Sequence, residues 1–159
     1  MLYSNDQLNS KGTAKTRVGR YSERNRIYHV VTKTQGNEPL LRPFASARIA
    51  IDMLRQQQDQ HHATSLAFVV MPDHLHWLVQ LTGERSLSVC VNTLKSGSTR
   101  RINTATCRSG RLWQKGFFDH AVRVEEDIPA IARYIIANPV RAGIVKSVRD
   151  FPHWDAIWL

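Results

Sequence analysis

Alternating apolar and polar positions predict four β-strands along this chain. The segment IYHVVTK at 27–33 alternates and carries β-branched residues, which is typical of a strand. LAFVVM at 66–71 and HLHWLVQL at 74–81 flank a break at Pro72-Asp73, so they predict a β-hairpin. FFDHAVRV at 117–124 predicts the fourth strand.

Three further segments have the period of an amphipathic helix. The first runs from Phe44 to about residue 60, and the second follows Ser86, a candidate N-cap. We expect this second helix to give way to a loop or a frayed end in the polar, basic segment 95–111. The third covers 125–138, with acidic residues in its first turn and Pro139 at its end.

The element order β-α-β-β-α-β-α predicts an α+β fold of the ferredoxin-like, split βαβ type. We expect a small antiparallel sheet with helices on one face and the active site on the other. Residues 1–22 are interpreted as a basic, flexible N-terminal arm, and residues 23–159 as a single domain. No stretch reaches the roughly 20 apolar residues of a membrane span, and we expect no secretion signal.

The charge of the chain predicts a polyanionic partner. Lys and Arg number 22 against 13 acidic residues, which gives a net charge of +9. Nucleic acid is the natural partner for such a chain, although a generally basic soluble surface is the plainer alternative. Two widely separated cysteines, Cys90 and Cys107, suggest neither a disulfide framework nor a zinc site, so we expect a cytoplasmic protein. With a nucleic-acid partner, we expect it to be associated with the nucleoid.

Basic residues without acidic neighbours are the candidate DNA contacts. Lys95, Arg100 and Arg101 could contact phosphates or form a solvated basic face. Trp113 beside Lys115 could stack on unpaired bases, although Trp113 could equally belong to the core. In the arm, Arg17 and Arg20 could reach along DNA or be disordered.

Two histidines interrupt the most apolar strand, MPDHLHWLVQL at 71–81. Strand alternation places Leu75 and Trp77 toward the helices and His74 and His76 together on the other face, about 6–7 Å apart. Two imidazoles at that spacing can converge on one metal ion or one phosphate. A pair of satisfied core histidines remains the alternative, because the His-x-His pattern alone is a weak motif.

Three stretches together resemble the HUH single-strand endonucleases, and within them the REP-associated tyrosine transposases. They are MPDHLHWLVQL, LWQKGFFDHAVRVEEDI and YIIANPVRAGIV, in the order and spacing of that family, and the resemblance covers roughly residues 25 to 155. It implies an HUH catalytic domain that cleaves and transfers single-stranded DNA carrying REP palindromic hairpins. It also implies a monomer.

The resemblance assigns a role to each candidate residue. Tyr134 would attack a phosphodiester and form a 5′-phosphotyrosine link, while His74, His76 and Asn138 would hold Mg²⁺ or Mn²⁺ on the scissile phosphate. From the residues alone, Tyr134 could instead pack at the sheet edge and Asn138 cap the helix. His120 is expected to be structural or to support the metal ligands.

Two other functions remain open from the sequence. The fold could be a module that binds REP hairpins with little or no cleavage, or a ferredoxin-like domain that binds RNA.

Overall fold

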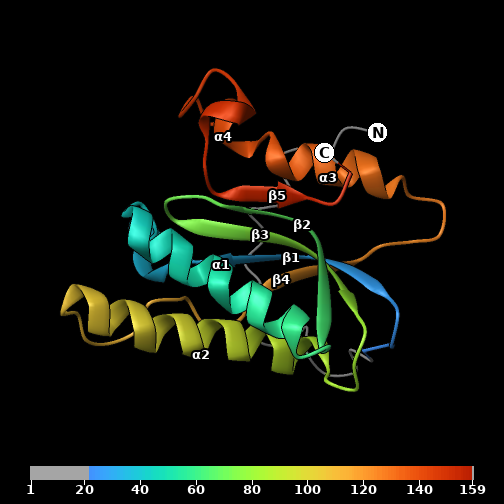
Figure 1. The fold of residues 1–159 in the computed structure, drawn as a ribbon, viewed down its shortest axis with the longest axis horizontal. Coiled ribbons are helices and arrows are strands. Elements are labelled where there is room, and N and C mark those ends of the chain that lie inside the picture. Colours follow the sequence, from blue (N-terminus) through green and yellow to red (C-terminus); the bar gives the residue numbers. More distant parts are fainter. Residues whose placement is uncertain (1–21, 159) are drawn as a thin grey trace.

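The computed structural model describes residues 22–158 and is built around a five-stranded antiparallel sheet (Figure 1). Across the sheet the strands are β4 (Phe118–Ala121), β1 (Ile27–Lys33), β3 (His74–Leu81), β2 (Ala63–Val70) and β5 (Trp154–Ala156). The predicted N-terminal arm, including Arg17 and Arg20, lies outside the described residues except for Ser22. None of the described helices is long and apolar enough to cross a membrane.

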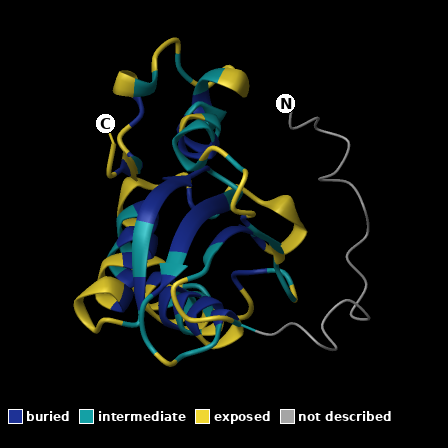
Figure 2. Ribbon diagram, turned by 90° about the vertical axis from the view of Figure 1, so that its right-hand side faces the viewer, coloured by how far each residue is buried: buried dark blue, intermediate teal, exposed yellow. Residues whose placement is uncertain are grey.

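The first layer of the core lies between one face of the sheet and two long helices. These are α1 (Phe44–Asp59) and α2 (Leu87–Thr106), which pack side by side (Figure 1). The side chains of Leu75 and Trp77 on β3 are fully buried against them, as the alternation predicts. Figure 2 shows the central strands as the most buried part of the molecule.

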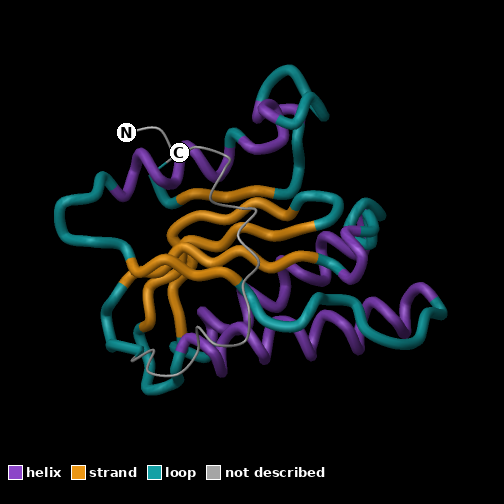
Figure 3. Tube along the Cα trace, turned by 180° about the vertical axis from the view of Figure 1, so that it is seen from behind, coloured by secondary structure: helices purple, strands orange, loops and turns teal. Residues whose placement is uncertain are grey.

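The second face of the sheet carries α3 (Ile128–Ile136), which packs along β2 and β5 (Figures 1 and 3). Ala132 and Ile135 of this helix are buried in a second apolar cluster with Val69 and Leu78 of the sheet. The α+β class is confirmed, but the helices do not all lie on one face. The face that carries the histidine pair is therefore bordered by α3.

Helix α2 is longer than its sequence predicts. The segment expected to be a loop continues as helix to Thr106. Its hydroxyl groups do not compete with the helix, because Thr99, Thr104 and Thr106 each donate to the carbonyl four residues earlier. The expectation of a loop from residue 95 was wrong for this reason.

The C-terminal part also differs in detail. The third helix begins at Ile128 after an Asp127 cap, whose carboxylate accepts from the amide of Ala130, and not at residue 125. A short helix, α4 (Asn138–Arg141), follows directly. Strand β5 was not predicted, because three residues are too few to show a period.

Candidate active site

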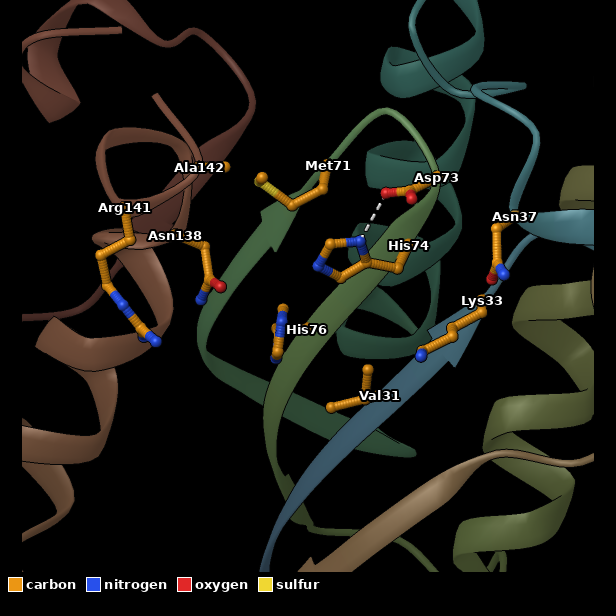
Figure 4. Close-up of a pocket in the computed structure, with 10 residues that line it drawn as sticks. All are labelled: Val31, Lys33, Asn37, Met71, Asp73, His74, His76, Asn138, Arg141 and Ala142. Atoms are coloured by element: carbon orange, nitrogen blue, oxygen red, sulfur yellow. Dashed lines mark hydrogen bonds and ion pairs between the residues drawn. The ribbon is translucent and has the colours of Figure 1, made fainter. Parts of the chain in front are cut away.

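A cavity of about 440 Å³ lies between the sheet and α4 (Figure 4). It forms where β1 and β3 run side by side, and their register places Lys33 opposite His74 and Val31 opposite His76. Its lining residues come from β1, β3, the turns next to them and α4: Val31, Lys33, Asn37, Met71, Asp73, His74, His76, Asn138, Arg141 and Ala142. The cavity thus brings together all three residues expected to hold a metal.

His74 is oriented by the residue before it. Its Nδ1 lies 2.6 Å from Oδ1 of Asp73. A carboxylate can only accept, so Nδ1 of His74 carries a hydrogen, and in the neutral ring Nε2 keeps its lone pair. Figure 4 shows the other ring nitrogen directed away from Asp73, toward the α4 side of the cavity. This is the arrangement that prepares a histidine to bind a metal.

His76 is paired with a second buried histidine, His29. Their side chains come from β3 and β1, and Nδ1 of His76 lies 3.0 Å from Nε2 of His29. Burial and the nearby His120 lower the pKa of His29 to about 4. Burial, followed by the neighbouring charge of His29, lowers the pKa of His76 well below its usual value. Both rings are therefore neutral at pH 7 and share one N–H between them.

His29 is a site residue that sequence reasoning missed. The alternation of IYHVVTK places it on the same face of β1 as Val31 and Lys33. Only the pairing of β1 with β3 shows that this face meets the histidine pair. The sequence carried the periodicity but not the strand order.

Asn138 is held at the junction of α3 and α4. Its Nδ2 donates to the carbonyl of Ile135 at 2.8 Å and to that of Tyr134 at 3.3 Å. Pro139 has no N–H for the Ile135 carbonyl four residues earlier, and the Asn138 amide takes that place. Because Nδ2 donates to the helix carbonyls, Oδ1 is the atom of Asn138 that could coordinate a cation.

The donor atoms in the cavity fit a divalent cation. The rings of His74 and His76 have centroids 5.1 Å apart, and Asn138 adds an amide oxygen. Within residues 22–158 no three His, Cys, Asp or Glu side chains gather as a metal cluster, and the amide oxygen of Asn138 would serve as a third protein donor beside the two imidazoles. Three protein ligands leave positions open for substrate, as a catalytic site requires.

Two cationic side chains line the cavity beside this donor set, whereas the expected nucleophile lies outside the lining. Lys33 and Arg141 line the cavity, which favours an anionic ligand such as a phosphate. Tyr134 is half-buried at the edge of the second apolar cluster and is not one of the described residues that line the cavity. The Arg141 guanidinium lies over its ring, 4.2 Å from the centroid.

His120 extends the row of histidines to β4. It pairs with His29 across the β1–β4 ladder, and its Nε2 lies 3.0 Å from both carboxylate oxygens of Glu126. Glu126 also accepts from the amide of Arg123, so this contact ties β4 to the segment before α3. A structural or supporting role for His120 stays a prediction.

Two of the side chains expected to contact DNA, Trp113 and Lys95, make hydrogen bonds within the protein. Trp113 is 2% exposed and donates from Nε1 to Ser98, so its ring belongs to the core and offers no face to a base. Nζ of Lys95 donates to the carbonyls of Gln114 and Gly116, both at 2.6 Å. Lys95 therefore holds the loop before β4, and a phosphate contact by Lys95 stays a prediction.

The remaining basic candidates are exposed on the side of α2. Arg100 lines a second cavity of about 350 Å³ between α1 and α2, and Arg101 lies 3.7 Å from Asp52. Lys115 is exposed in the loop before β4. Arg100 and Arg101 belong to α2, on the face of the sheet opposite the histidines, and Lys115 lies in the loop before β4. Their part in DNA binding stays a prediction.

Comparison with known proteins identifies relatives. The family model of IS200-like transposases matches residues 22–138. A protein of Haemophilus influenzae, provisionally named a REP-associated tyrosine transposase, is 28% identical over 109 residues, which are 62% of this chain and 62% of that protein. The REP-associated tyrosine transposase of Escherichia coli is 34% identical over 87 residues, 54% of this chain and 50% of that protein. The chain thus spans between half and two thirds of these curated relatives.

Solved structures share the fold. A REP-associated tyrosine transposase bound to a REP hairpin aligns with a TM-score of 0.68 and 24% identity, over 85% of this chain and 79% of that chain. A transposase structure from Deinococcus radiodurans, provisionally named, aligns with a TM-score of 0.53 and 27% identity, over 76% and 95%. The resemblance drawn from the three sequence stretches is confirmed. Because the family model covers most of the chain, this protein belongs to the IS200-like transposase family.

Proposed function

We propose that this protein is a metal-dependent endonuclease and strand transferase of single-stranded DNA, and that it acts on REP palindromic hairpins through a covalent 5′-phosphotyrosine. The observation that carries the proposal is the cavity in which His74, His76 and Asn138 meet beside Lys33 and Arg141. Nitrogen and amide donors next to cations suit a metal-bound phosphate better than an uncharged ligand.

The metal would be Mg²⁺ or Mn²⁺, held by His74, His76 and Asn138. When bound, such an ion supplies Lewis-acid stabilisation of negative charge on phosphate oxygens. Lys33 and Arg141 would bind the same phosphate through charge-assisted hydrogen bonds and orient it.

Tyr134 is the proposed nucleophile. Its phenolic oxygen would form a bond to phosphorus while the bond from phosphorus to the 3′ oxygen breaks. The phenolic proton passes to solvent, and the departing 3′ oxygen takes one up, which leaves a 5′-phosphotyrosine and a free 3′-OH. Tyr134 lies one helical turn before Asn138, and Arg141 contacts both its ring and the cavity.

REP hairpins are proposed as the substrate because the relatives are named for them. The E. coli relative is a REP-associated tyrosine transposase, and the structure with a TM-score of 0.68 contains a REP hairpin. The net charge of +9 supports a polyanionic partner. We propose that the protein acts as a monomer.

One observation favours a second function, hairpin binding with little or no cleavage. Tyr134 lies beside the cavity and its ring is covered by the Arg141 guanidinium. If substrate does not displace Arg141, the phosphate and the phenol stay apart and the protein only binds.

Incubation of end-labelled single-stranded REP DNA with the protein and Mn²⁺ distinguishes these functions. The proposal predicts cleavage by the wild type, and binding without cleavage by Tyr134→Phe. Tyr28→Phe is the matched control, because Tyr28 is a buried phenol of β1 that accepts from the amide of Glu23 and should leave cleavage unchanged. Binding without any cleavage by the wild type would support the second function and contradict the first.

Competition in the same assay tests whether the substrate is DNA or RNA. An RNA hairpin that competes at least as well as the DNA hairpin would contradict the DNA substrate and favour an RNA-binding domain. Affinity should fall steeply as salt rises from about 50 to 200 mM.

A further inference from the structure

The ring nitrogen of His76 that carries the hydrogen, Nδ1 or Nε2, decides whether His76 can bind a cation. His29 and His76 are 5% and 2% exposed, and their facing nitrogens are 3.0 Å apart. Their ring planes differ by only 22°, and the ring centroids lie 5.3 Å apart. One ring must donate and the other accept.

The two possible arrangements have opposite consequences for the cavity. If Nδ1 of His76 donates to His29, then Nε2 of His76 has a free lone pair and can bind a cation. If Nε2 of His29 donates instead, the hydrogen of neutral His76 lies on its own Nε2, which then cannot act as a ligand. Strand pairing alone does not choose between them.

His74 gives the precedent within the same site. Asp73 accepts from Nδ1 of His74 and thereby leaves Nε2 of His74 available. Both histidines use the same ring atom, Nδ1, for their protein contact. Metal-binding histidines almost always have an acceptor for the hydrogen on their other nitrogen, and here a carboxylate stands behind one ring and an imidazole behind the other.

We propose that His29 is a positioning residue that accepts the Nδ1 hydrogen of His76 and so presents Nε2 of His76 to a divalent cation. The inference rests on the proposed metal site, and it adds a residue from β1 that does not itself line the cavity. Such partners of metal-binding histidines change metal affinity by roughly 10- to 100-fold when removed.

The first test needs neither metal nor substrate. Long-range ¹H–¹⁵N correlation spectra of the imidazoles in the metal-free protein report which nitrogen of His76 carries the hydrogen, with His76→Gln used for assignment. The inference predicts the Nδ1–H form. The Nε2–H form would overturn it, whether or not the protein binds a metal.

The second test compares two substitutions of His29 by Mn²⁺ titration. His29→Phe keeps a ring of similar size without an acceptor, and it should weaken Mn²⁺ binding about 10- to 100-fold. His29→Gln retains an oxygen near the Nε2 position and should bind within about threefold of the wild type. Equal binding by wild type and His29→Phe would overturn the inference.

A matched control separates this effect from general disturbance of the fold. His153 is also buried, between the rings of Phe44 and Phe151, and lies outside the cavity lining. His153→Phe should bind Mn²⁺ as the wild type does, and a loss equal to that of His29→Phe would overturn the inference. If the wild type binds no Mn²⁺, the proposed function fails instead, and the tautomer of His76 distinguishes that failure from this one.

Discussion

At the scale of single residues, hydrogen-bond partners behind the cavity matter as much as the groups that line it. His74 has the Asp73 carboxylate, His76 has His29, and Asn138 has the carbonyls at the end of α3. Each contact uses one polar atom and leaves the other for a ligand. The candidate ligands are thus held in place before any metal or phosphate arrives.

Replacement of Asp73 by Ala should weaken Mn²⁺ binding by about tenfold, because the His74 ring loses the acceptor that fixes its orientation. Asp73→Asn keeps an oxygen that can accept and should lose less. Isothermal titration with Mn²⁺ measures both. The control is Asp59→Ala, an exposed carboxylate at the end of α1. Equal affinities for Asp73→Ala and Asp59→Ala would show that Asp73 has no orienting role.

At the scale of elements, strands were predictable where their period was long. The limits of β3 agree with the predicted strand, and its alternation placed Leu75 and Trp77 in the core and His76 on the opposite face. The position of Tyr134 relative to the cavity could not be predicted, because it depends on how α3 packs against β2 and β5. Those contacts join segments far apart in sequence, and β5 itself has no pattern that would reveal it.

Helix α2 contains two basic residues that the sequence could not distinguish. Lys95 points into the loop before β4 and donates to two carbonyls, whereas Arg100 is exposed beside the α1–α2 cavity. Both belong to one acid-free segment, so composition assigned them the same function. Only the fold of the loop back onto the helix separates a structural lysine from a candidate phosphate contact.

Lys95→Met should therefore lower the free energy of unfolding by about 1–3 kcal/mol, because two carbonyls lose a charged donor. Arg100→Met, a matched loss of one positive charge, should change it by less than about 0.5 kcal/mol. Urea unfolding followed by circular dichroism gives both values. If Arg100→Met were the more destabilising of the two, the structural role of Lys95 would be refuted.

At the scale of the whole molecule, the sheet separates the main apolar core from the candidate active site. One face and its two long helices form the larger apolar cluster, and the other face combines a smaller cluster with the polar cavity. His29 and His76 are buried on this second face, and burial lowers the pKa of both rings. The same burial makes the stability of the protein sensitive to acid.

His153 offers a test of that sensitivity away from the cavity. Burial, followed by the charge of Arg48, lowers its pKa below the usual 6.5. As pH falls through about 6.5, the unfolded chain takes up a proton that folded His153 does not, so the free energy of unfolding decreases. The decrease stops once the pH is below the folded-state pKa.

His153→Phe should accordingly show a smaller loss of stability than the wild type between pH 7.5 and 5, measured by urea unfolding at each pH. The other buried histidines titrate in both proteins, so the difference between the two curves isolates His153. Parallel curves over this range would contradict a lowered pKa for His153.

The measurement that tests the central proposal most directly is the location of the covalent bond to DNA. The protein is incubated with single-stranded REP DNA and Mn²⁺, digested with protease and nuclease, and its peptides are examined by mass spectrometry. The account predicts one nucleotide-modified residue, Tyr134, and no modification once His76 is replaced by Ala. A modification at any other residue, or cleaved DNA with no modified peptide, would contradict it.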